Sequence, residues 1–118
     1  MPPHNFNDLR AAIRAFAHAR DWEQFHTPKN LGMALSVETA ELMEHFQWLS
    51  PEQSASLDPE TRQEVAQEIG DVLIYLTRLA DVLGIDPLQA ASDKMEINAA
   101  KYPVDKSKGN NTKYDKLQ

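Results

Sequence analysis

The apolar residues of this chain recur at helical spacing. They return every three or four residues over most of the sequence, no run alternates apolar with polar residues, and glycine occurs only four times. Capping residues stand directly before proline at four places, a pattern typical of helix starts because proline has no N–H to leave unpaired in the first turn. These places are Thr27-Pro28, Ser50-Pro51, Asp58-Pro59 and Asp86-Pro87. The pattern predicts an all-α fold.

The predicted elements are four helices joined by short connections. They cover about residues 7–20, 28–48, 59–83 and 87–101, and Gly84 ends the third. Residues 50–57 form a predicted loop with room for one short turn. Beyond Pro103 the composition is that of a mobile tail. We therefore expect an all-α domain over residues 1–104 and a polar C-terminal tail over residues 105–118.

Acidic residues fall on the faces of the second and third predicted helices that should be buried. At about 100° per residue, Glu38 and Glu41 share a stripe with Leu31, Leu35 and Leu42. The corresponding stripe of the third helix contains Glu64, Val65, Glu68, Asp71, Val72, Tyr75 and Leu79. If these two helices pack together, the acids at positions 38, 41, 68 and 71 converge, because a spacing of three places each one turn from its neighbour.

Such a cluster calls for a positive counter-ion. Four carboxylates in a partly desolvated cleft cost several kcal/mol each unless they are protonated or neutralised. With no cysteine in the chain, and without the Glu-x-x-His pairs of di-iron bundles, oxygen ligands favour a hard cation, Mg²⁺ or Mn²⁺. Because Mg²⁺ keeps positions open for water and substrate phosphates, the cluster indicates a phosphate-handling enzyme. Solvated acidic helix faces and a carboxylate-bridged iron site remain as alternatives.

The fourth predicted helix carries a polar stripe. Lys94, Asn98 and Lys101 recur at i, i+4 and i+7, and therefore lie on one face. Two cations and an amide suit a polyphosphate, although a solvated lysine-rich face gives the same pattern.

Several aromatic residues lie in or beside predicted loops. A nucleotide base can stack on Trp22, Phe25 or Trp48, which otherwise serve as packing lids. His26, in the same loop as Trp22, either donates a hydrogen bond to a base or caps the loop.

Composition excludes several classes of function. The 118 residues suffice for one domain, and 18 acidic against 12 basic residues give a net charge of -6, which disfavours binding to nucleic acid or to anionic membranes. The absence of cysteine excludes disulfides, thiolate metal sites and thiol nucleophiles. The apolar run at 72–77 is far shorter than the roughly 20 residues that span a bilayer, and no signal peptide is found. We expect a cytoplasmic protein.

Four segments together resemble a known family, the all-α nucleotide pyrophosphohydrolases of the MazG-like superfamily, and within it the dCTP pyrophosphatase branch. The segments are RDWEQFHTPKNL, ALSVETAELMEHFQW, RQEVAQEIGDVLIYL and KMEINAAKYP, and the tail motif TKYDKL also agrees. The paired Glu-x-x-Glu and Glu-x-x-Asp motifs mark the superfamily, whereas WEQFH, FQW and KMEIN mark the branch. The resemblance covers nearly the whole chain from about residue 5.

The resemblance implies Mg²⁺-dependent hydrolysis of dCTP, or of a related or modified dNTP, to the monophosphate and pyrophosphate, by attack of a metal-activated water on the α phosphorus. It implies that the metal ligands and catalytic residues are Glu38, Glu41, Glu68 and Asp71. It implies that the substrate-binding residues are Trp22, Glu23, Gln24, Phe25, His26, Trp48 and Tyr75 for base and sugar, with Lys94, Asn98 and Lys101 for the phosphates. One departure, Ile13 in place of a substrate-facing histidine, leaves the base preference open.

The resemblance further implies a homotetramer built as a dimer of dimers. Independently, the back of the third predicted helix is apolar at Ile69, Leu73 and Ile74, and one chain of four helices can hardly cover it. We therefore expect a four-helix MazG-like bundle completed by oligomerisation. A non-catalytic helical module, for nucleotide binding or assembly, remains the alternative to an enzyme.

Overall fold

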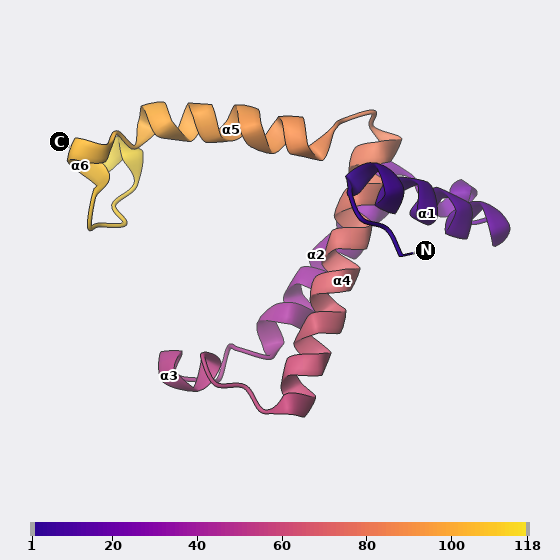
Figure 1. Ribbon diagram of the computed structural model, residues 1–118, viewed down its shortest axis with the longest axis horizontal. Helices are drawn as coiled ribbons and strands as arrows, with labels where there is room; N and C mark the ends of the chain where they lie inside the picture. Colours follow the sequence, from indigo (N-terminus) through magenta and orange to yellow (C-terminus); the bar gives the residue numbers. More distant parts are fainter. Residues whose placement is uncertain (1, 118) are drawn as a thin grey trace. The chain divides into compact units, whose positions relative to one another are not determined.

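The computed structural model describes residues 2–117, which form two compact units, one ending at Gly84 and the other beginning at Ile85. The first unit contains α1 (Phe6–Ala19), η1 (Glu23–Phe25), α2 (Pro28–Glu44), α3 (Pro51–Ser54) and α4 (Pro59–Val82) (Figure 1). The second contains α5 (Pro87–Lys101), α6 (Val104–Ser107) and η2 (Tyr114–Lys116). No strand occurs among residues 2–117. The predicted all-α class is confirmed.

Side-chain caps confirm all four predicted helix starts. Each capping side chain accepts a backbone N–H, at 3.2 Å for Thr27, 3.1 Å for Ser50, 2.8 Å for Asp58 and 2.9 Å for Asp86. Ser50 also forms a reciprocal capping box with Gln53. The first helix begins slightly earlier than predicted, at Phe6, because the Asn5 side chain accepts the N–H of Asp8 at 2.8 Å.

The predicted end of the second helix is wrong. Helix α2 ends at Glu44 rather than near Trp48. Beyond it, the N–H groups of Phe46 and Leu49 bond to carbonyl groups three residues back, at 2.9 Å each, which makes turns instead of a continued helix. The sequence carries no glycine or proline between Gly32 and Pro51 to mark this stop. In contrast, α4 ends as expected beside Gly84, which adopts a φ of 70°.

Part of the predicted tail folds into short helical turns. The structure places α6 and η2 in the segment that composition alone indicated to be mobile. The ring of Tyr114 packs edge-on against Tyr102, with centroids 6.2 Å apart, and the Lys101 ammonium lies 4.5 Å from the Tyr114 ring. These aromatic contacts hold η2 against the end of α5, although both tyrosines remain 37% and 50% exposed.

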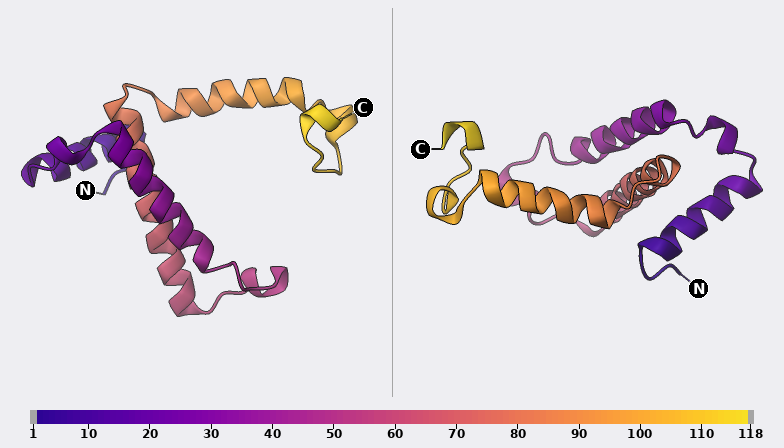
Figure 2. Two further views of the ribbon diagram at one scale, coloured as in Figure 1. Left: turned by 180° about the vertical axis from the view of Figure 1, so that it is seen from behind. Right: turned by 90° about the horizontal axis from the view of Figure 1, so that it is seen from above.

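The core of the first unit lies between α2 and α4, which run side by side in opposite directions, while α1 packs on α4 (Figures 1 and 2). Its buried apolar residues are Ala17, Leu31, Val65 and Ala80. Phe16 of α1 is half exposed in the single chain. No helix within residues 2–117 is long and apolar enough to cross a membrane.

Candidate active site

The acidic faces of α2 and α4 meet. Glu38 and Glu41, one turn apart on α2, and Glu68 on α4 each offer a carboxylate oxygen, and these three oxygens lie within 4.8 Å of one another. Asp71, the fourth predicted acid, is not a member of this group. It lies one turn beyond Glu68, and its negative charge contributes to the raised pKa of Glu38. Helix periodicity on both elements therefore brings the acids to one place.

The cluster is electrostatically unsatisfied. Burial, followed by the neighbouring carboxyl groups of Glu41 and Glu68, raises the pKa of Glu38 to about 7. One carboxyl oxygen each of Glu38 and Glu68 is buried without a hydrogen-bond partner among the described residues. Buried, unpartnered carboxylate oxygens are costly. A hard divalent cation would satisfy both oxygens at once, and the donor set fits such an ion.

The raised pKa of Glu38 predicts an unusual pH dependence of stability. Folding raises this pKa from 4.5 to about 7, so the native state holds a proton that the unfolded state releases between these values. This stabilising contribution is complete below the unfolded pKa and is lost as the pH rises through the folded one. For metal-free protein we expect a loss on the order of 1 kcal/mol between about pH 5 and pH 8, or about 5 °C in Tm.

Differential scanning calorimetry in the presence of a chelator measures this effect. In Glu38→Gln protein the same pH change should lower Tm much less, because the amide does not titrate. An identical pH profile in both proteins would show that Glu38 is not the group responsible.

A pocket of about 310 Å³ lies between the loop of residues 21–26, here called the aromatic loop, and helices α2 and α4. Its lining residues are Trp22, Phe25, His26, Asn30, Leu31, Ala34 and Tyr75. Four of the predicted substrate-binding residues thus meet at one place. Trp22 and Phe25 are 44% and 58% exposed, so their rings remain accessible to a flat ligand. The Asn30 amide donates to the Phe25 carbonyl at 3.0 Å and holds the loop against α2.

Three other predicted substrate-binding residues are not among those that line this pocket. The Glu23 carboxylate lies 2.6 Å from Nδ1 of His18. The Gln24 amide donates to the Asp21 carbonyl at 3.0 Å. Trp48, beyond the end of α2, is 85% exposed. Glu23 and Gln24 therefore bond to residues close to them in the sequence, and the Trp48 side chain is exposed to solvent.

The three predicted phosphate-binding residues lie on α5, in the second unit. Lys94 and Asn98 are exposed, and Lys101 contacts Tyr114. Helical spacing confirms that they share a face, and their role stays a prediction.

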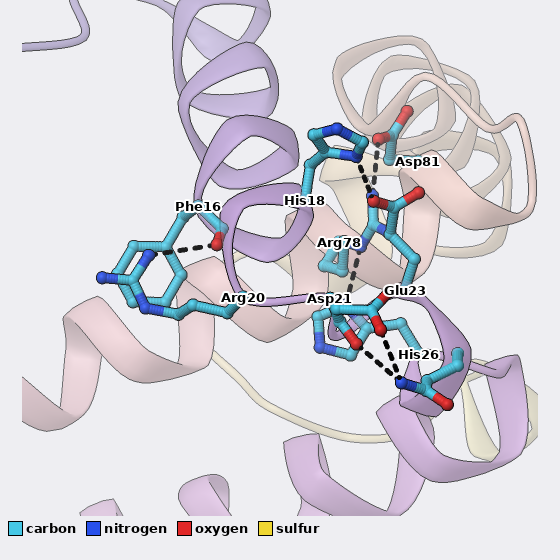
Figure 3. A network of polar contacts seen from close by, with 9 residues as sticks. Phe16, His18, Arg20, Asp21, Glu23, His26, Arg78 and Asp81 are labelled. Atoms are coloured by element: carbon cyan, nitrogen blue, oxygen red, sulfur yellow. Dashed lines mark hydrogen bonds and ion pairs between the residues drawn. The ribbon is translucent and has the colours of Figure 1, made fainter.

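A buried charge network in α4 was missed from the sequence. Arg78, only 9% exposed, donates from Nε to Nδ1 of His26 at 3.0 Å and from Nη1 to Asp81 at 3.3 Å (Figure 3). Arg14 of α1 in turn donates to both oxygens of Asp81, at 2.7 and 2.5 Å. The pair at positions 78 and 81 looks like an ordinary solvated i, i+3 pair. The sequence feature that could have revealed the buried arginine is the position of Thr77 and Arg78 inside an otherwise apolar stretch.

Comparisons with known proteins agree with this fold. The MazG-like family model matches residues 33–117. The chain is 42% identical to dCTP pyrophosphatase 1 of Mus musculus and 39% identical to that of Homo sapiens, in both cases over 98% of this chain and 69% of the relative. It also resembles the crystal structure of a pyrophosphatase from Archaeoglobus fulgidus, with a TM-score of 0.80 and 43% identity over 87% of this chain and 96% of that one.

The chain belongs to the MazG-like family. The resemblance to the dCTP pyrophosphatase branch that its sequence motifs indicated is confirmed as well.

Proposed function

We propose that this protein is a nucleoside triphosphate diphosphatase that cleaves dCTP, or a related or modified dNTP, to the monophosphate and pyrophosphate. The supporting observation is that the acidic cluster adjoins the aromatic pocket. Ala34 of the pocket is four residues from Glu38 on α2, and Tyr75 is four residues from Asp71 on α4. At 1.5 Å per residue, each pair is separated by about 6 Å along its helix. A base in the pocket therefore has its phosphates within reach of the carboxylates.

The acids would hold Mg²⁺, with Glu38, Glu41 and Glu68 as ligands and Asp71 joining them from the next turn. When bound, Mg²⁺ or Mn²⁺ supplies Lewis-acid stabilisation of the charge that develops on the phosphoryl oxygens. Glu41 accepts a hydrogen bond from the attacking water and orients it. The water oxygen bonds to the α phosphorus as the bond to the bridging oxygen breaks in line, so that pyrophosphate leaves with no covalent enzyme intermediate.

The pocket residues position the nucleotide. Trp22 and Phe25 offer ring faces for base stacking, and Tyr75 closes the side of the pocket formed by α4. The polar stripe of α5, at positions 94, 98 and 101, is proposed to bind phosphate oxygens on the strength of its charge and spacing.

We propose a homotetrameric enzyme of the cytoplasm, where free nucleotides occur. The apolar back of α4 supports an assembly, since Ile69, Leu73 and Ile74 are 53%, 38% and 42% exposed in the single chain. An unpartnered apolar stripe of this kind is typical of a subunit interface.

Product analysis tests the proposed reaction. Protein incubated with dCTP and Mg²⁺ should release dCMP and pyrophosphate in equal amounts, resolved by anion-exchange chromatography. Release of dCDP and orthophosphate would contradict the proposed bond cleavage, and no turnover of any ordinary or 5-substituted dNTP would favour a binding module instead.

A further inference from the structure

We propose that Arg78 is a positioning residue, which holds His26 in the tautomer that carries its proton on Nε2 and so makes this histidine a hydrogen-bond donor to the nucleotide base. The tautomer assignment stands on the geometry of the chain alone. The role toward the base rests on the proposed function.

The direction of the Arg78–His26 hydrogen bond decides the tautomer. A guanidinium group can only donate, and Nε of Arg78 lies 3.0 Å from Nδ1 of His26. Nδ1 must therefore be the acceptor, and in the neutral ring the proton is on Nε2. Burial and the positive charge of Arg78 lower the pKa of His26, while Glu23 opposes this change. The neutral ring therefore predominates at neutral pH.

Arg78 is itself held in place by two further charged side chains. Its side chain is 10% exposed, and Nη1 donates to the carboxylate of Asp81, which is 6% exposed. The two hydrogen bonds from Arg14 lower the pKa of Asp81, so this carboxylate is ionised at neutral pH. The bonds of Arg78 to His26 and Asp81 connect α4 with the aromatic loop (Figure 3), and the bonds of Arg14 to Asp81 connect α4 with α1. Because the Arg78 side chain is only 10% exposed, turning the guanidinium away from His26 would leave the buried Nε–H group without this acceptor.

A fixed donor in the pocket selects for an acceptor on the ligand. His26 lines the same pocket as Trp22 and Phe25. A base stacked there therefore meets an imidazole ring whose Nε2 carries the proton and can donate a hydrogen bond. Cytosine presents adjacent acceptors at its carbonyl oxygen and at the unprotonated ring nitrogen, whereas the corresponding ring nitrogen of thymine or uracil is a donor. The carbonyl oxygen next to this ring nitrogen is an acceptor in all three bases and does not distinguish them. An Nε2–H group that faces the ring nitrogen does favour a cytosine-type base, because two N–H groups that face each other are both left without an acceptor.

Imidazole nitrogen resonances of the full chain report the tautomer directly. In wild-type protein without nucleotide, two-dimensional ¹H–¹⁵N spectra should show His26 with an unprotonated Nδ1 and a protonated Nε2, the signals being assigned by their loss in His26→Gln. Arg78→Met should shift both nitrogens toward the averaged values of mixed tautomers. A proton on Nδ1 in wild type, or unchanged His26 signals in Arg78→Met, would overturn the proposal. Neither result depends on turnover, so failure of the tautomer assignment can be distinguished from failure of the proposed function.

Steady-state kinetics test whether the Arg78–His26 hydrogen bond contributes to binding of the base. Arg78→Met should raise KM for dCTP about fivefold to tenfold, corresponding to one hydrogen bond, with a smaller change in kcat. Arg62→Met, which removes an exposed arginine from the same helix, should leave KM within about twofold. An unchanged KM in folded Arg78→Met protein whose tautomer has shifted would overturn the role in base recognition.

Discussion

Replacing Glu38 with glutamine should lower kcat for dCTP hydrolysis by a factor of about 100 to 1,000. Glu38 belongs to the acidic cluster, and one of its carboxyl oxygens is buried with no hydrogen-bond partner within residues 2–117. Glutamine keeps the size of the side chain and removes the negative charge that holds the cation, so stabilisation of the phosphoryl charge is lost. Steady-state rates at saturating Mg²⁺ and dCTP measure the effect.

Glu44→Gln is the matched control for this substitution. Glu44 lies on the same helix, is exposed, and does not belong to the acidic cluster. Its replacement should change kcat by no more than about twofold. If Glu38→Gln retained half of the wild-type kcat, or lost no more than Glu44→Gln, the assignment of the cluster as the catalytic centre would be wrong.

The second large effect is expected at Trp22. Its ring lines the aromatic pocket at 44% exposure, and its edge packs on Phe16 at a centroid distance of 5.7 Å, which fixes the ring without covering it. Base stacking is worth about 1–3 kcal/mol, so Trp22→Ala should raise KM for dCTP about 10-fold to 100-fold. The change in kcat should be smaller, because the carboxylates of the acidic cluster are unchanged.

Trp22→Phe separates stacking from simple packing. A phenyl ring preserves a face for the base, so KM should stay within about fivefold of wild type. Thermal unfolding of each variant shows whether the pocket survives. A wild-type KM in Trp22→Ala protein would show that Trp22 does not contribute to binding of the base.

Local signals in the sequence account for much of the fold. The capping residues before Pro28, Pro51, Pro59 and Pro87 fix four helix starts because each cap acts through hydrogen bonds within one turn. The end of α2 escaped prediction because residues 45–49 carry no comparable local stop, and turn hydrogen bonds replace the helix there.

The candidate site was predictable to the extent that it depends on periodicity. Glu38 and Glu68 stand among apolar residues on their helices, and acids on a face that should be buried indicate a cation from the sequence alone. The bond from Arg78 to His26 was not predictable, because it joins residues 52 positions apart and depends on how the loop packs on α4. Glu23 and Gln24 shared a motif with Trp22, yet their partners are His18 and Asp21.

Calorimetric titration of Mg²⁺ into the full chain, at about pH 8 where Glu38 is ionised, tests the central claim most directly. Wild-type protein and Glu44→Gln should bind the ion with similar affinity, and Glu38→Gln should bind it at least about tenfold more weakly. Absence of Mg²⁺ binding by the wild type, or equal affinity in all three proteins, would contradict a metal centre between α2 and α4.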